Sequence, residues 1–186
     1  QDYRSTRNAT ELMCRPLLTE DYIPQPVVFV SPPRWNLAHT SWFFEEFILK
    51  PHLPGYQQVH PLYNHLFNSY YVGAGSSARR DQRGDLSRPS AQEVYRYREH
   101  VDRYMTRLLE NELPEQVTDL VILGINHEQQ HQELFFTDLK YTFHQNPLKP
   151  AYGERAYCEE GSAGRAEMIK VPEGMYNIGY NGRGFS

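Results

Sequence analysis

The sequence has little cysteine and no long hydrophobic run. Its 186 residues include two cysteines, Cys14 and Cys158, which form no Cys-x-x-Cys pair. This argues against a disulfide-rich scaffold and against a thiolate zinc site. No stretch approaches the ~20 consecutive apolar residues that a transmembrane helix needs, and no basic start followed by an apolar run indicates a signal peptide. We therefore expect a soluble protein of the reducing cytoplasm that has no membrane partner.

An excess of positive charge is also absent. The formal net charge is −4, and no basic run is longer than Arg79-Arg80. Proteins that wrap nucleic acid neutralise phosphates with clustered lysine and arginine, so we do not expect a nucleic-acid partner. Hydrophobic residues make up 39% of the chain, which is enough for a sizeable core and argues against a disordered body.

Apolar residues recur at helical spacing over most of the first 145 residues. Ser90 and Glu93 form a capping-box pattern that opens one long helix, and prolines separate several of the periodic segments. The pattern predicts helices over residues 5–18, 35–50, 61–72, 90–113 and 115–145. Long amphipathic helices with proline-marked breaks predict an all-α fold of the helical-bundle type over residues 1–150.

The character of the chain changes after residue 150. Residues 151–166 show no periodicity and are expected to form a linker. Residues 168–179 alternate in a way that is typical of short strands with a turn. We therefore expect residues 167–186 to be the truncated start of a second domain.

The strongest chemical signal is a pair of histidines, His127 and His131. Side chains at positions i and i+4 lie on one helical face, so two such imidazoles can converge on one metal ion. His39 lies on an apolar face between Trp35 and Trp42 and is the best third ligand. The alternative is that all three are hydrogen-bonded core or surface histidines. The other five histidines are expected to have surface or packing roles.

A three-histidine site leaves positions open on Fe(II), zinc or another divalent ion for water, oxygen or a thiol. The second histidine comes one residue too late for a His-Glu-x-x-His motif, which excludes a zincin protease. Gln130 and Glu133 lie beside the histidine face, where they form either a solvated face or contacts to a metal-bound substrate. Arg80 and Arg83 stand in a glycine-containing loop and either are solvated or bind carboxylates.

Several separated motifs together resemble one known family. The stretch Trp35-Asn36-Leu37-Ala38-His39-Thr40-Ser41-Trp42-Phe43-Phe44-Glu45 resembles the W-x-L-A-H-T-x-W-F-F-E segment of the ergothioneine-biosynthesis sulfoxide synthases, and 127–133 matches their H-x3-H-x-E signature. Residues 67–71 and 86–90 also match family segments. The resemblance covers about residues 5–150 and implies a DinB-like four-helix bundle. The tail from residue 167 looks like the start of the α+β formylglycine-generating-enzyme-like domain that follows in these proteins.

The resemblance also implies a function. These synthases use Fe(II) and O2 to join the imidazole of hercynine to the thiol of gamma-glutamylcysteine or cysteine, and they oxidise the sulfur to a sulfoxide. Carried over by motif, His39, His127 and His131 are the expected iron ligands, and Gln130 is expected near hercynine. Arg80 and Arg83 are expected to hold the carboxylates of the thiol substrate. The family's catalytic tyrosine belongs to the second domain, so we expect this chain to bind iron without turnover.

Three alternatives stay open. A sister synthase of the selenoneine or ovothiol pathway uses another nucleophile or another imidazole. A DinB-like thiol transferase combines a bacillithiol-type thiol with zinc or nickel at a three-histidine site. A non-catalytic helical interaction domain would hold the same histidines only as core residues.

Overall fold

A computed structural model of the chain describes residues 2–71, 73, 75–153, 164–180 and 182. The chain divides into two units, Gln1–Tyr152 and Gly153–Ser186. The described part of the first unit is helical and contains no strand, which confirms the all-α prediction. No helix in the described residues is both long enough and apolar enough to cross a membrane.

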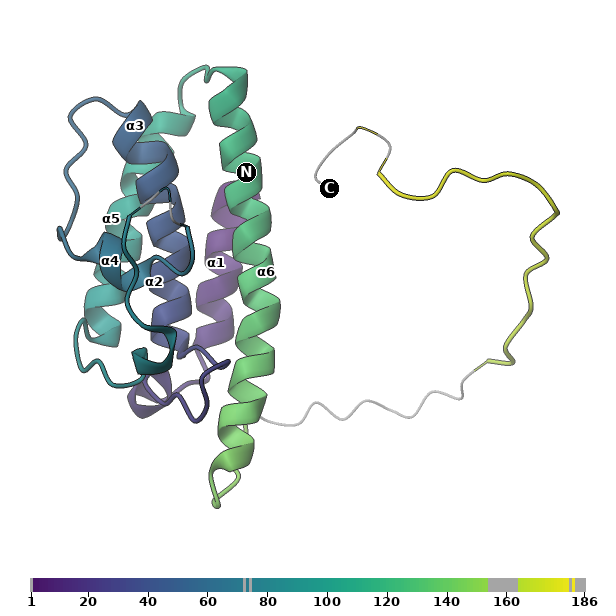
Figure 1. The fold of residues 1–186 in the computed structure, drawn as a ribbon, viewed down its shortest axis with the longest axis horizontal. Helices are drawn as coiled ribbons and strands as arrows, with labels where there is room; N and C mark the ends of the chain where they lie inside the picture. Colours follow the sequence, from purple (N-terminus) through teal and green to yellow (C-terminus); the bar gives the residue numbers. More distant parts are fainter. Residues whose placement is uncertain (1, 72, 74, 154–163, 181, 183–186) are drawn as a thin grey trace. The chain divides into compact units, whose positions relative to one another are not determined.

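Four long helices form the bundle. They are α1 (Asp2–Cys14), α2 (Pro33–Phe44), α5 (Ala91–Leu109) and α6 (Glu115–Gln145). Figure 1 shows them side by side, with α2 packed against both α5 and α6, and α1 packed against α6. The side chain of Ser90 accepts a hydrogen bond from the backbone N–H of Glu93, so the expected capping box does begin α5.

The central helix is α2, and all twelve of its residues are buried. Its sequence explains this, because Arg34 is the only ionisable residue besides His39 and the rest are aromatic, aliphatic or small. The helix was expected to continue unchanged to residue 50. Instead it passes into a π-helical turn, η2 (Glu45–Leu49), and a short α3 (Lys50–His52). In that turn Glu45 is buried and accepts hydrogen bonds from the hydroxyls of Tyr56 and Tyr97.

The shorter elements differ more from the sequence-based expectation. The first helix begins and ends earlier than expected. In the segment expected to be helical over 61–72, the described residues 61–71 contain α4 (Tyr63–Phe67) and no other helix, and residue 72 lies outside the described residues. Two 3-10 turns, η1 (Thr19–Tyr22) and η4 (Arg80–Gln82), lie in the connections. By contrast, α6 has the predicted bounds.

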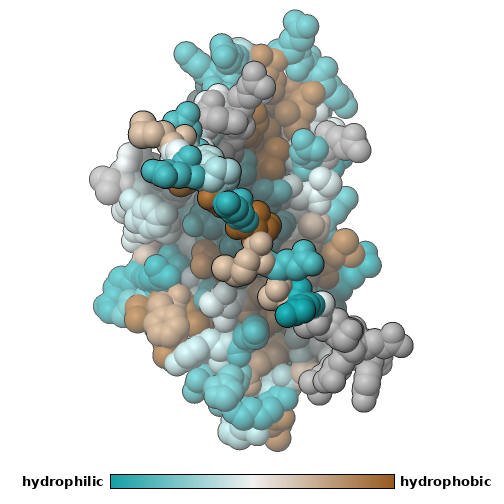
Figure 2. All heavy atoms as spheres, turned by 90° about the vertical axis from the view of Figure 1, so that its right-hand side faces the viewer, coloured by the Kyte–Doolittle hydropathy of each residue, from teal (hydrophilic) through white to brown (hydrophobic). Residues whose placement is uncertain are grey.

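The outer face of α6 is mixed in character. Figure 2 shows hydrophobic and hydrophilic residues mixed on one face of the molecule. Leu134 on this helix is 42% exposed. Ile122 and Leu123 are exposed to a similar degree, at 42% and 41%.

The second unit shows none of the expected strands in its described residues. Residues 164–180 contain no strand, and apolar side chains such as Met168, Met175 and Ile178 are fully or almost fully exposed. A strand needs a partner for its backbone hydrogen bonds, and no second strand is present in the described residues to supply one. Residues 154–163 of the expected linker lie outside the described residues.

Candidate metal centre

Three histidines from two helices meet inside the bundle. His39 comes from α2, and His127 and His131 come from one face of α6. Their candidate ligand atoms all lie within 4.8 Å of one another. Their ring centroids are 4.6 to 4.9 Å apart. The structure therefore brings together the three residues that the spacing and the tryptophan-flanked histidine singled out.

Two of the three rings are held by hydrogen bonds at Nδ1. His39 Nδ1 lies 2.6 Å from the backbone oxygen of Phe67. His131 Nδ1 lies 2.9 Å from Oδ1 of Asn36, which is one turn before His39 on α2. Because both acceptors are oxygens, each Nδ1 carries the proton, and each Nε2 keeps a free lone pair for a metal ion.

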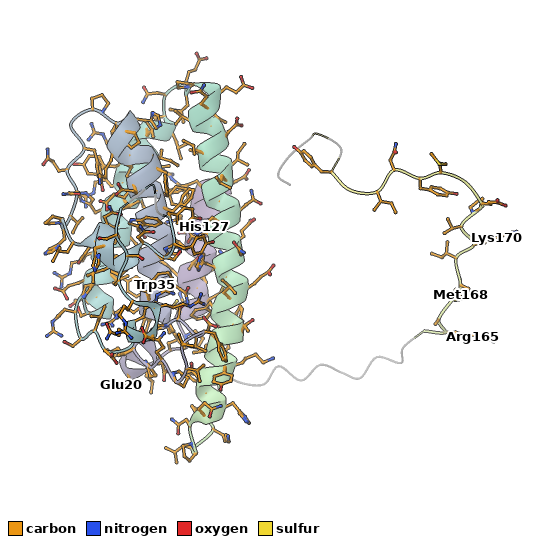
Figure 3. All side chains as sticks on the ribbon, viewed as in Figure 1. Glu20, Trp35, His127, Arg165, Met168 and Lys170 are labelled. Atoms are coloured by element: carbon orange, nitrogen blue, oxygen red, sulfur yellow. The ribbon has the colours of Figure 1, made fainter. Side chains whose placement is uncertain are left out.

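His39 lies between two indole rings. Trp35 stacks on one face with ring centroids 4.4 Å apart, and Trp42 stacks on the other at 5.2 Å. These are the only two tryptophans of the chain. Figure 3 shows Trp35 and His127 inside the helical unit. The stack restricts rotation of the His39 ring and excludes water from its faces.

The site favours neutral imidazoles. Burial lowers the pKa of His127 to about 4, against a smaller opposite effect of the Glu128 charge. Burial and then the charge of His127 lower the pKa of His131 to about 3. Burial likewise lowers the pKa of His39 well below its ordinary value. At neutral pH all three imidazoles are neutral, with one nitrogen unprotonated, which is the form that binds metal ions.

A metal ion also answers an unmet need of this site. His127 Nδ1 is buried and has no hydrogen-bond partner among the residues that the structure describes. A buried polar atom without a partner costs about 1–3 kcal/mol, and a buried cluster of three neutral imidazoles offers lone pairs and no matching donor. The residues present therefore fit a divalent metal ion, with nitrogen donors suited to iron, zinc or nickel.

A buried ionic network, not predicted from the sequence, lies next to the histidines. Glu128 is fully buried and accepts hydrogen bonds from Arg7, Arg98 and Thr10 at 2.6 to 3.0 Å. Arg7 also donates to Asp102 and to Ser41. The two guanidinium groups help to lower the pKa of Glu128 to about 2, in spite of its burial. The network ties α1, α2, α5 and α6 together one residue away from His127.

The sequence does contain a signal for this network. On α6, Glu128 falls in the buried stripe with Gly124 and Phe135, at helical spacing. On α5, Arg98 falls in the stripe with Val94 and Val101. Opposite charges in the apolar stripes of two helices indicate a buried ion pair.

The two loop arginines have different environments. Arg80 is exposed and donates to the backbone oxygens of Val28 and Phe29. Arg83 is buried, and its guanidinium carbon lies 3.3 Å from the ring centroid of Trp35. It donates to the hydroxyl of Ser31, but its buried Nε has no hydrogen-bond partner within the described part of the chain.

Burial, with a smaller effect of the Arg80 charge, lowers the pKa of Arg83 to about 9. Its positive charge also contributes to lowering the pKa of His39 and His131. The structure therefore places Arg83 beside the histidine cluster. Arg80 instead binds backbone oxygens of the segment that precedes α2.

Gln130 and Glu133 lie on the exposed side of α6. Neither side chain makes a hydrogen bond or ion pair with the described residues. The cluster of candidate ligands in the described residues contains neither of them.

The fold and the cluster define a class of protein: a helical bundle with a buried three-histidine centre that can hold a metal ion. The chain belongs to the DinB superfamily, whose family model matches residues 2–135. Members of this superfamily often bind metal ions. No curated protein shows significant similarity to the chain.

Proposed function

We propose that this chain carries the metal-binding domain of a non-haem Fe(II)-dependent sulfoxide synthase of ergothioneine biosynthesis. The reaction joins the imidazole of hercynine to the thiol of gamma-glutamylcysteine or cysteine with O2 and yields a sulfoxide. The cluster of His39, His127 and His131 supports the proposal most. These three histidines stand in the same sequence motifs that resemble the synthases. Bound Fe(II) would supply coordination positions for the thiol and O2, and would pass to O2 the four electrons that the two substrates lose when the C–S bond forms and the sulfur becomes a sulfoxide.

The chain's own residues have three tasks in this proposal. Asn36 and the Phe67 carbonyl oxygen hold the rings of His131 and His39, so that each Nε2 faces the centre. The two stacked tryptophans exclude water from one side of the site. Arg83 offers a buried charge and an unpaired N–H that attract a substrate carboxylate.

Metal binding is tested by anaerobic Fe(II) titration. Tryptophan fluorescence is a suitable signal, because both tryptophans stack on a proposed ligand. We expect saturable quenching with one ion per chain, and loss of this response in His131→Ala. The matched control is His144→Ala, an exposed histidine on the same helix. Binding that is unchanged in His131→Ala would refute the ligand assignment.

The reaction itself is tested in the full-length reading frame that contains this chain. Oxygen consumption that requires both hercynine and a thiol, with a sulfoxide product, supports the proposal. A protein that retains zinc or nickel and transfers a thiol without consuming oxygen is instead a DinB-like thiol transferase. Consumption with another imidazole, or with a selenol, indicates a sister synthase.

A further inference from the structure

A polar cleft lies between α1 and α5, away from the three histidines. Its volume is about 480 Å³, and its lining includes Arg4, Asn8, Arg103, Thr106 and Arg107. We infer that this cleft is a binding site for a small polyanion, that is, a molecule with a phosphate group or with several carboxylates. This site is independent of the proposed metal chemistry.

The floor of the cleft is already neutralised by internal partners. Arg7 uses all of its nitrogens, donating to Asp102, Glu128 and Ser41. Asp102 in turn accepts from Arg7 and from the hydroxyl of Tyr3. These groups hold the wall of the cleft in a fixed shape and leave no charge over for a ligand.

The rim has an unbalanced positive charge. Arg4 and Arg103 make no hydrogen bond or ion pair with any residue that the structure describes, and the Arg107 guanidinium contacts only the ring of Tyr104, at 5.6 Å from its centroid. Glu99 is the one remaining carboxylate in the lining. Three guanidinium groups thus face one carboxylate, in a protein whose formal net charge is −4.

Two of these arginines form a like-charged pair on α5, which Glu99, one turn before Arg103, offsets only in part. Arg103 and Arg107 are four residues apart on α5, so their charges lie on the same face one turn apart. Like charges at this spacing destabilise a helix by about 0.2–0.5 kcal/mol. An anion bound between the two guanidinium groups attracts both of them and offsets their mutual repulsion.

The donors match oxyanion chemistry. Guanidinium groups bind phosphate and carboxylate oxygens through pairs of parallel hydrogen bonds. The amide of Asn8 and the hydroxyl of Thr106 add neutral donors, and neither side chain has a hydrogen-bond partner among the described residues. The volume accommodates a ligand with several oxyanion groups rather than a single ion.

The test is calorimetric titration of the chain with pyrophosphate, citrate and inorganic phosphate at low ionic strength. We expect saturable binding of pyrophosphate or citrate, about tenfold or more weaker in Arg103→Gln, because one charge-assisted contact is lost. The matched control is Arg96→Gln, an exposed arginine on the same helix outside the cleft, which should bind within about twofold of the unsubstituted chain.

The three ligands separate the possible sources of the anion. Binding of pyrophosphate but not citrate assigns the site to phosphate compounds, and the reverse result assigns it to polycarboxylates. No saturable binding of any of the three would overturn the inference. Equal loss of affinity in Arg96→Gln and Arg103→Gln would overturn it as well, since it would show attraction to overall charge. Arg4→Gln gives a second variant from the other wall of the cleft.

Discussion

Replacement of Glu128 by glutamine tests the buried ionic network. The carboxylate is fully buried between Arg7 and Arg98, and it also accepts from Thr10. Glutamine keeps the size of the side chain but removes its charge. Two buried guanidinium groups are then left without their shared counter-ion, and we expect a large loss of stability.

The magnitude follows from two separate arguments. The pKa of Glu128 is lowered to about 2 from its ordinary value of 4.5, and at ~1.4 kcal/mol per unit this corresponds to about 3 kcal/mol in favour of the charged, folded form. Removing one partner of a buried ion pair in other proteins costs about 3–5 kcal/mol. We therefore expect a loss of about 3 kcal/mol, or about 6–12 °C in Tm for a domain of this size.

The stabilisation by the Glu128 carboxylate should depend on pH in a characteristic way. Since the folded pKa is below the unfolded one, the stabilisation is fully present above about pH 4.5 and is lost as the pH falls towards 2. The difference in unfolding free energy between the unsubstituted chain and Glu128→Gln should therefore shrink below pH 4.5. Urea unfolding followed by circular dichroism measures it.

The control for this experiment is Glu133→Gln, the same substitution at an exposed position of α6. It should change stability by less than about 0.5 kcal/mol. If Glu128→Gln is as stable as this control at pH 7, the carboxylate is not stabilised by its neighbours and the reasoning is wrong.

Three further predictions concern the histidines and the core. In chelator, lowering the pH from 7 to 5.5 should destabilise the chain by about 2–3 kcal/mol through His127 and His131 alone, because the unfolded imidazoles take up protons near pH 6.5 and the folded ones do not; a flat urea-unfolding profile over this range would contradict it. Gly124→Ala should destabilise the bundle by about 1–3 kcal/mol through overpacking, because the new Cβ would lie 2.5 Å from Cε1 of Phe44; an unchanged Tm would show that the ring moves freely. Asn36→Ala removes the acceptor of the His131 Nδ1–H and should weaken Fe(II) binding about 10–100-fold; equal fluorescence titrations of the variant and the unsubstituted chain would assign Asn36 a packing role only.

Helix α6 shows how much of this fold can be predicted from the sequence. Pro114 precedes the helix and a regular apolar stripe follows it, so its bounds and the inward direction of His127 are local properties of the sequence. The π-helical turn after Phe44 has no such local signal. It depends on the burial of Glu45 against two tyrosines from other elements, and no periodicity within the helix itself indicates it.

The candidate metal centre could likewise be predicted only in part from the sequence. The three histidines were identified from helical spacing and from the flanking tryptophans. The acceptors that orient them were not, because a backbone oxygen at Phe67 and an amide at Asn36 carry no distinctive sequence pattern. Arg80 is exposed and Arg83 is buried because of the path that their loop takes over the bundle. Two arginines three positions apart in the sequence do not indicate that path.

The ion pair of Arg7 with Glu128 joins residues that are 121 positions apart in the chain. During synthesis α1 is made before α5 and α6, so Arg7 can pair with Asp102 only after α5 has been made, and with Glu128 only after the first half of α6 has been made. Contacts of such long sequence separation form late in folding, because a large loop must be closed before they contribute. His127 is the residue just before Glu128, so the same event that completes the charge network brings the first α6 histidine to α2. Closure of the bundle and assembly of the histidine cluster are thus expected to be one folding step.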